Sequence, residues 1–290
     1  MARELSVTEQ RRTIYERIAF GLVFTFLTLY CISLVIFFSW GIMSSLKGHT
    51  EFLRYPMDLP VKWRFENYLT AFQTLTYGEI NILGMVFNTI WETVLSNALS
   101  IISVCTTGYI FAKYHFKGKE IVFAIVIFTM TIPIYGNMAA NYKLVYSLGI
   151  DNSPLFFITS LGGFGSNFLI AYAVFKGVPW SYAEAAFIDG CGRFRCYVTI
   201  MLPMIKGLIA TFFIQGFIAG WNNYMTSLMY LPEFPTLALG LFGYRSRANY
   251  VPNDPVFLAG VITSMIPCVF IFSFCNGYIT KNLTIGGLKG

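Results

Sequence analysis

Charged residues are scarce in this sequence of 290 residues: 12% are Asp, Glu, Lys or Arg, while 56% are hydrophobic. Soluble domains carry about 25% charged residues, so this composition argues against an ordinary water-soluble protein. Six long stretches contain no charge at all: 18–46, 93–112, 121–142, 152–175, 207–232 and 255–280. Each is long enough to cross about 30 Å of hydrocarbon as a helix. The sequence therefore predicts an all-α integral membrane protein with six transmembrane helices.

The motifs of several protein classes are also missing. No Gly-x4-Gly-Lys-Ser/Thr phosphate loop is present, so the chain is not expected to hydrolyse ATP. The sequence has only two histidines, His49 and His115, and no His-Glu-x-x-His or Gly-x-Ser-x-Gly, which argues against an enzyme and predicts no catalytic residue and no metal site. Proton-coupled carriers usually place an ionisable group within a span, and the six stretches contain none. An ion-coupled secondary transporter or channel stays as the alternative, because backbone carbonyls also bind ions.

The six cysteines do not form a disulfide framework. Cys191 and Cys196 lie in a loop and have no nearby histidine with which to bind zinc. The others fall within the uncharged stretches: Cys31, Cys105, Cys268 and Cys275. The first stretch exceeds the ~7–15 apolar residues of a signal peptide, so we interpret it as a membrane anchor that is retained.

Lysine and arginine predict the orientation. Of the 20 basic residues, thirteen fall on the side that holds both termini and the loop around Glu184. Because cytoplasmic segments are enriched in Lys and Arg, both termini and this loop are expected in the cytoplasm. The net charge of +6 is then a consequence of topology, and no nucleic-acid partner is expected.

Four regions follow from this topology: 1–46, the cytoplasmic N-terminus and first helix; 47–83, extracytoplasmic; 84–280, the transmembrane core with a loop at 176–206; and 281–290, a cytoplasmic tail. In the extracytoplasmic region, Phe65, Tyr68 and Phe72 share a face at helical spacing. This pattern is typical of an amphipathic helix at the membrane surface, and equally of a lid beneath an external partner.

Small residues recur at intervals of three or four in two stretches. They include Gly108 in 93–112, and Gly216 and Gly220 in 207–232. Lipid does not drive helices together by the hydrophobic effect, so close packing through small residues takes that role. A compact bundle is therefore expected. Pro133 and Pro267, inside stretches, are expected to bend their helices.

The loop at 176–206 predicts a short helix. Ser181 and Glu184 have the spacing of a capping box, and Ala183, Ala185 and Ala186 favour a helix with little bulk. Gly190 allows the backbone to turn sharply at the end of this helix. A second helix from 193 to 205 is expected to re-enter the bilayer with a bend at Pro203. The alternative for Glu184 is that it only caps the start of the short helix in which it lies.

The spacing of Glu184-Ala185-Ala186, Gly190 and Leu202-Pro203 resembles the signature loop of permease subunits of ABC importers. The resemblance implies that the loop forms a coupling helix between spans 4 and 5 that docks on a cytoplasmic ATPase. Five residues match this motif or lie within it. The resemblance implies that they contact the ATPase: Glu184, Ala185, Ala186, Asp189 and Gly190.

Further segments resemble the maltose-type carbohydrate permeases of this family: Asn88-Thr89, 108–119, 148–152, 221–223 and 283–290. Gly207 and Asn282 depart from the family pattern. The resemblance implies a subunit of a bacterial cytoplasmic membrane importer, without a cofactor of its own. Its expected partners are a second homologous permease, two ATPase subunits that bind ATP and Mg, an extracytoplasmic sugar-binding protein, and a carbohydrate, with an oligosaccharide favoured.

Aromatic rings and neutral polar groups are the side chains that suit a sugar path. Two sets are candidates: Gln215, Trp221, Asn222, Asn223 and Tyr224, and, beside Pro133, Thr129 and Thr131. The alternative is that Trp221 and Tyr224 belong to the interfacial aromatic belt, while the amides bond between helices.

Overall fold

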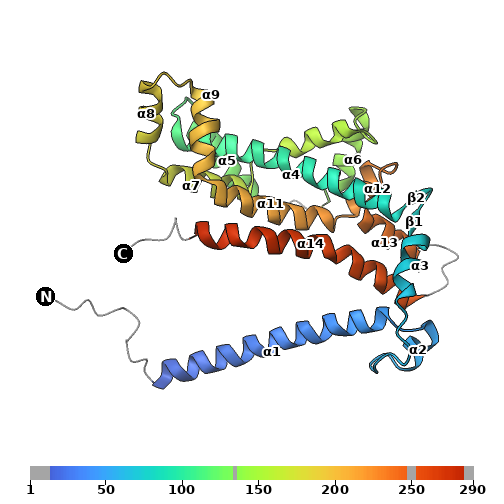
Figure 1. Ribbon diagram of the computed structural model, residues 1–290. Coiled ribbons are helices and arrows are strands. Elements are labelled where there is room, and N and C mark those ends of the chain that lie inside the picture. The colour runs from blue at the N-terminus through green and yellow to red at the C-terminus, as the bar shows by residue number, and fades with distance from the viewer. Residues whose placement is uncertain (1–13, 133–135, 247–252, 284–290) are drawn as a thin grey trace. The chain divides into compact units, whose positions relative to one another are not determined.

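The computed structural model describes residues 14–132, 136–246 and 253–283, and almost all of its regular structure is helical (Figure 1). The elements are α1 (Ile14–Ser45), α2 (His49–Arg54), α3 (Glu66–Thr74), β1 (Thr76–Tyr77), β2 (Ile80–Asn81), α4 (Ile82–Lys113), α5 (Lys119–Thr131), α6 (Met138–Ser147), η2 (Pro154–Leu161), α7 (Ser166–Gly177), α8 (Ser181–Ile188), α9 (Arg193–Cys196), the π-helical η3 (Tyr197–Met201), α10 (Leu202–Met204), α11 (Lys206–Trp221), α12 (Met225–Tyr230), α13 (Leu237–Ser246) and α14 (Asp254–Leu283). The two short strands form an antiparallel pair.

The chain forms two compact units. The first holds the residues up to Ala71 together with 253–262, and the second holds 72–252 together with 263–290. Pro133 and the tail motif from 284 to 290 lie outside the described residues, so what the sequence predicts for them stays a prediction. Pro267 lies inside α14, as predicted.

Three helices in the described part of the chain are long and apolar enough to cross a membrane: Tyr15–Ser45, Ile82–Lys113 and Asp254–Phe274. Two bent pairs, Pro154–Leu161 with Ser166–Gly177 (55°) and Arg193–Met204 with Lys206–Trp221 (77°), raise the number to as many as five. The structure therefore supports a mostly helical membrane protein with three to five candidate spans, fewer than the six predicted.

The difference lies in the third uncharged stretch, 121–142. There α5 ends at Thr131, Ile132 is extended, and α6 begins only at Met138. A helix of 13 residues covers about 20 Å at 1.5 Å per residue, short of the ~30 Å of hydrocarbon. An uncharged stretch shows that a segment tolerates lipid, but it does not show that the helix is continuous.

Helix α4 lies at the centre of the second unit and packs against α7, α11, α13 and η2. Glycines allow this packing. A Cβ atom on Gly108 would lie 2.8 Å from the Cβ of Ala171 in α7, and one on Gly216 of α11 would lie 2.2 Å from Asn97 in α4. The predicted packing through small residues is confirmed at these positions.

Glu92 corrects the expectation that the spans are free of charge. The uncharged stretch begins at residue 93, but α4 begins at Ile82, so Glu92 lies ten residues inside the helix. Its side chain is only 7% exposed and accepts a hydrogen bond of 3.1 Å from Ser227 Oγ of α12. A carboxyl group inside a candidate span is thus satisfied by a residue that is distant in sequence.

Candidate functional site: a hairpin beyond the helical bundle

Helix α8 begins at Ser181, so the predicted short helix is confirmed but its predicted cap is wrong. Trp180 occupies the N-cap position with helical dihedral angles, and no side chain caps the helix. The Trp180 carbonyl instead accepts the backbone N–H groups of Ala183 (2.9 Å) and Glu184 (3.1 Å). Because Ser181 is already helical, its hydroxyl does not take the capping position, and Glu184 is left as an exposed side chain.

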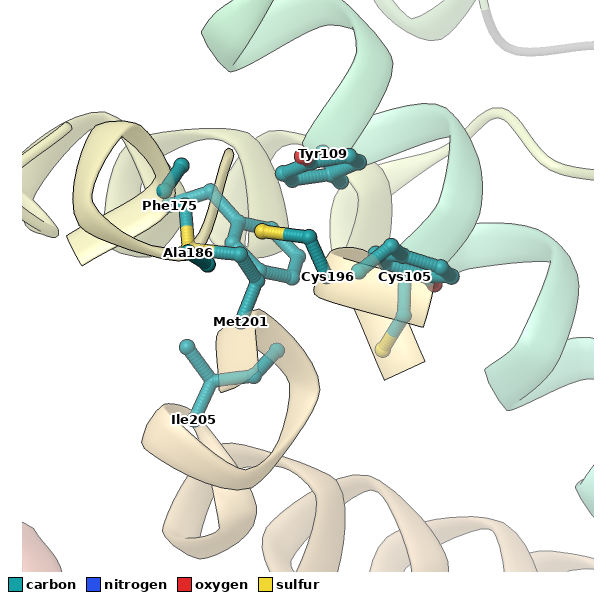
Figure 2. Close-up of a cluster of buried hydrophobic side chains, with 9 residues drawn as sticks. Cys105, Tyr109, Phe175, Ala186, Cys196, Met201 and Ile205 are labelled. Carbon is teal, nitrogen blue, oxygen red and sulfur yellow. The ribbon is translucent and has the colours of Figure 1, made fainter. Parts of the chain in front are cut away.

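The two faces of α8 differ. Ala183 is 0% and Ala186 is 7% exposed, because both pack into an apolar cluster (Figure 2). Around Ala186 the cluster holds Phe175 of α7, Cys196 of α9 and Met201 of η3. Ala185 is exposed. The predicted alanine face is therefore divided: Ala186 belongs to the interior of this subunit, and only Ala185 is accessible to a partner.

The C-terminus of α8 is a glycine-dependent turn. Gly190 has a φ of +79°, and no atom lies within 4 Å of the position of an added Cβ. The N–H of Gly190 bonds to the Phe187 carbonyl (3.0 Å), and the N–H of Cys191 bonds to the Ala186 carbonyl (2.9 Å). These two bonds form a Schellman motif, which requires a left-handed residue at this position. The predicted sharp exit at Gly190 is confirmed.

Together, α8, α9 and η3 form a hairpin with a groove of about 550 Å³. Ala185, Asp189 and Gly190 line one part of it, and Arg195 and Thr199 another. Glu184 is exposed but does not line the groove. The structure thus brings Ala185, Asp189 and Gly190 together at one opening, while Ala186 contributes to its floor and to the apolar cluster.

Two residues of this hairpin were not singled out from the sequence. Ile188 is 86% and Phe194 is 80% exposed, although both are large and apolar. Such side chains on a surface mark a contact with a partner or with lipid when they gather. In the sequence, these two apolar residues lie on either side of Gly190 in a loop otherwise rich in small and polar residues. That pattern could have identified them as contact residues.

The hairpin packs against α4 through Tyr197. Tyr197 of η3 stacks on Tyr109 of α4 with ring centroids 4.7 Å apart, and its hydroxyl lies 3.0 Å from Thr106 Oγ1. The chain then turns by 77° into α11. The break falls at Ile205, whose φ and ψ are −104° and 19°, rather than at the predicted Pro203, which lies in the first turn of the short α10.

The first candidate set for a sugar path does not form a single surface. Trp221 is 3% exposed, and its Nε1 donates to the Ser264 carbonyl of α14 (2.9 Å), so its role is packing. Tyr224 stacks on Phe242 of α13 at 4.5 Å. Asn222 and Asn223 are exposed, but their amides donate locally, to the Ile218 carbonyl and to Thr226 Oγ1.

Gln215, the remaining member of the set, is exposed on α11. In the second set, Thr129 and Thr131 are exposed on α5, and their hydroxyls donate to the carbonyls of Val126 and Ile127. Intrahelical bonds of this kind satisfy a threonine that faces an apolar environment. No hydrogen bond or ring contact joins the two sets within the described residues. Within the same described ranges, no cluster of three or more His, Cys, Asp or Glu could hold a metal ion.

A membrane-embedded helical bundle with an exposed two-helix hairpin is the architecture of a transporter subunit. The sequence profile of the family described as "Binding-protein-dependent transport system inner membrane component" matches residues 104–284, which is more than half of the chain. The chain belongs to this family. It is therefore a multi-pass inner membrane permease of a binding-protein-dependent ABC importer, and a transport subunit rather than an enzyme.

The individual relatives are also named as permease proteins, and each match covers most of both chains. The arabinooligosaccharides transport system permease protein AraQ of Bacillus subtilis is 29% identical, over 86% of this chain and 88% of that protein. The maltodextrin transport system permease protein MdxG of the same organism is 27% identical, over 92% and 95%. The diacetylchitobiose uptake system permease protein NgcG of Streptomyces coelicolor is 25% identical, over 91% and 87%.

A solved structure has the same fold. It is the crystal structure of a bacterial ABC transporter involved in the import of the acidic polysaccharide alginate. One of its chains superposes with a TM-score of 0.75 at 19% identity, covering 92% of this chain and 98% of that one. At this identity the likeness establishes the fold alone.

Proposed function

We propose that this permease imports a carbohydrate, with an oligosaccharide as the preferred size. The similar permeases named above serve arabinooligosaccharides, maltodextrin and diacetylchitobiose, all of which are chains of sugars. The permease pairs with a second homologous permease to enclose the path, receives the sugar from an extracytoplasmic binding protein, and is driven by two cytoplasmic ATPase subunits that bind ATP and Mg. It needs no cofactor of its own.

The single observation that supports energy coupling is the divided α8. One face, with Ala183 and Ala186, is buried in the cluster that also contains Cys105 and Tyr109 of α4. The other face presents Ala185 beside the exposed Ile188. A push on the exposed face passes through close-packed side chains into α4, because packed interiors transmit displacement with little compression. We assign the ATPase contact to Glu184, Ala185, Asp189 and Gly190, with Ile188 and Phe194 as added anchors.

The same proposal includes six membrane crossings with both termini and the α8 hairpin in the cytoplasm. The basic residues support this orientation, since thirteen of 20 fall on that side. The third crossing then consists of α5 and α6 around the break between them. Reagents that do not cross the membrane should label a cysteine at Asp151 or Glu233 in intact cells, and one at Lys117 or Glu184 only after the cells are opened.

The transport activity itself is tested with purified components. The complete importer in lipid vesicles, supplied with ATP on the side of the ATPase subunits and with a binding protein on the opposite side, should move a neutral oligosaccharide across the membrane. Uptake that continues without the ATPase subunits, driven by an ion gradient, would instead support the ion-coupled alternative. Omission of the binding protein is the matched control, and it should abolish uptake.

A further inference from the structure

The extracytoplasmic segment after α1 has an unusual distribution of polarity. Between residues 44 and 67, seven residues are buried, and four of these are polar: Ser44, Ser45, Lys47 and Asn67. In contrast, every odd-numbered residue from 53 to 65 is apolar and more than half exposed. These seven form what we call the apolar strip: Leu53, Tyr55, Met57, Leu59, Val61, Trp63 and Phe65.

Two of the buried polar side chains, those of Lys47 and Asn67, hold the strip in place by bonding to the backbone. Lys47 is 0% exposed, and its Nζ donates to the carbonyls of Tyr55 (2.9 Å) and Pro56 (3.0 Å). The indole N–H of Trp40, on α1, donates to the same Pro56 carbonyl (2.8 Å). These bonds fix the beginning of the strip to the last turns of α1.

The end of the strip is fixed in the same way. Asn67 Nδ2 donates to the carbonyls of Ser45 (2.7 Å) and Lys47 (2.8 Å), and the Arg64 N–H donates to the Leu46 carbonyl (2.8 Å). The segment therefore leaves the end of α1 and returns to it. Because the bonds of Lys47, Asn67 and Arg64 fix the path of the backbone, the exposure of these apolar side chains is not the result of an unfolded loop.

We infer that the apolar strip is a membrane-interface anchor that inserts into the boundary between lipid headgroups and acyl chains. Four polar residues among the seven buried ones, with seven apolar side chains exposed, are the reverse of the arrangement favoured in water, where burial of apolar surface drives folding. The strip begins at Leu53 in α2, the short helix that follows α1, and α1 is a candidate span whose most apolar window has no residue buried. The lipid surface is therefore already present where the strip begins.

The composition of the strip fits an interface better than it fits the surface of a soluble receptor. Trp and Tyr are enriched where a membrane meets water, and Lys and Arg extend their charged ends from there to the headgroups. Residues 53–65 contain Arg54, Lys62 and Arg64 against the single acidic Asp58. A receptor that binds and departs in each cycle would leave seven apolar side chains in water between cycles, whereas lipid covers them throughout.

The test measures lipid contact in the complete importer, reconstituted in lipid vesicles from a cysteine-free variant that still transports. A fluorophore on Val61→Cys, at a position 90% exposed, should be quenched by phospholipids brominated near the top of the acyl chain, at a depth of about 5–10 Å below the headgroup boundary. A label at Phe24 of α1 should be quenched by bromine deeper in the chain. A label at Lys117, in the loop after α4, should not be quenched by either lipid.

Two variants make the outcome specific. Aspartate at both Met57 and Leu59 should move the Val61 label into water, seen as loss of lipid quenching and a gain of quenching by iodide. Asp58→Asn, between them and also exposed, should leave lipid quenching unchanged. The inference is overturned if the unmodified strip is quenched by iodide but not by brominated lipid. It is also overturned if the label is shielded only when the binding protein is added, which would make the strip a receptor surface.

Discussion

Ser227 Oγ, in the first turn of α12, donates a hydrogen bond of 3.1 Å to the Glu92 carboxyl group in α4. Two more contacts join the same part of α4 to the chain that follows α12. Asn88 Nδ2 donates to the Pro235 carbonyl (3.1 Å), and Thr89 Oγ1 accepts from the Leu237 N–H (2.8 Å). Residues 227–237 are thus held against α4 by three polar side chains spaced along one helix.

We expect Glu92 and Ser227 to act as a pair. Ser227→Ala leaves a buried carboxyl without this donor, and a polar bond between membrane helices contributes about 0.6–1.7 kcal/mol. Glu92→Gln keeps an acceptor oxygen and should lose less than Glu92→Leu. Unfolding of the purified importer by denaturant measures the three single variants and the double variant Ser227→Ala with Glu92→Leu. A double variant whose loss equals the sum of the single losses would show that the two side chains are not coupled.

Gly108 should not tolerate even a methyl group. Its added Cβ would meet the backbone N of Tyr172 at 3.1 Å as well as the Ala171 side chain, so α4 and α7 would have to separate. Overpacking of this kind costs about 1–3 kcal/mol. Gly108→Ala should lower the thermal unfolding temperature. Gly177→Ala, at the end of α7 with nothing within 4 Å of the new Cβ, is the control and should unfold at the original temperature.

Bulky residues at Ala185 and Ala186 should have different effects. Ala185→Trp fills the outer side of the hairpin, so the permease should fold normally but bind its ATPase more weakly. A steric misfit of about 1–3 kcal/mol weakens association by about five- to more than a hundred-fold. Ala186→Trp should instead lower the stability of the permease itself, because Ala186 is 7% exposed. Co-purification of the ATPase and thermal unfolding, measured on both variants, separate the two effects.

Gly190 should be replaceable by asparagine but not by valine. At a φ of +79°, a β-branched residue is strained, and the Schellman turn should open at a cost of about 1–3 kcal/mol. Asparagine tolerates this region of backbone conformation. We expect Gly190→Val to reduce substrate-stimulated ATP hydrolysis while Gly190→Asn retains it. Equal activity of the two variants would contradict the turn as a requirement for coupling.

Variants at Gln215 and Trp221 should distinguish a residue that contacts the ligand from one that packs in the interior. Gln215→Ala should raise the substrate concentration needed for half-maximal uptake and leave unfolding unchanged, because the side chain is exposed. Trp221→Ala should lower stability by about 3–5 kcal/mol, the usual range for a buried aromatic residue. Uptake and unfolding of each variant are the measurements. A Gln215→Ala variant with unaltered uptake would remove this residue from the path.

The sequence was sufficient for the class of protein, for the helix at 181–188 and for the turn at Gly190. The uncharged stretches, the alanines, the glycine and the spacing of the signature loop are all local features of the sequence. The uncharged stretch that predicts the second span begins only at residue 93, because Glu92 interrupts it, whereas α4 begins at Ile82. The burial of Glu92 is made possible by Ser227, which is 135 residues away, and local sequence does not reveal such a partner.

The alanines of α8 show a second limit of local reasoning. Spacing by three places Ala183 and Ala186 on one side of the helix and Ala185 on another. Which side is covered depends on Phe175 and Met201, contributed by other elements. The capping box failed for a related reason: the turn at Trp180 already supplies the carbonyl that begins the helix, so Ser181 enters it. Tertiary contacts decided which alanines are covered, while the backbone conformation at Trp180 decided where the helix begins.

Energy coupling through the α8 hairpin is tested best by uptake and ATP hydrolysis measured together in vesicles containing the complete importer. With the binding protein present, a neutral oligosaccharide should stimulate ATP hydrolysis and be transported. Ala185→Trp should abolish both while the two permeases still assemble in the membrane. If that variant retained bound ATPase and full uptake, the α8 hairpin would not be the coupling element. If the importer preferred a charged substrate to any neutral sugar, the proposed substrate class would be contradicted.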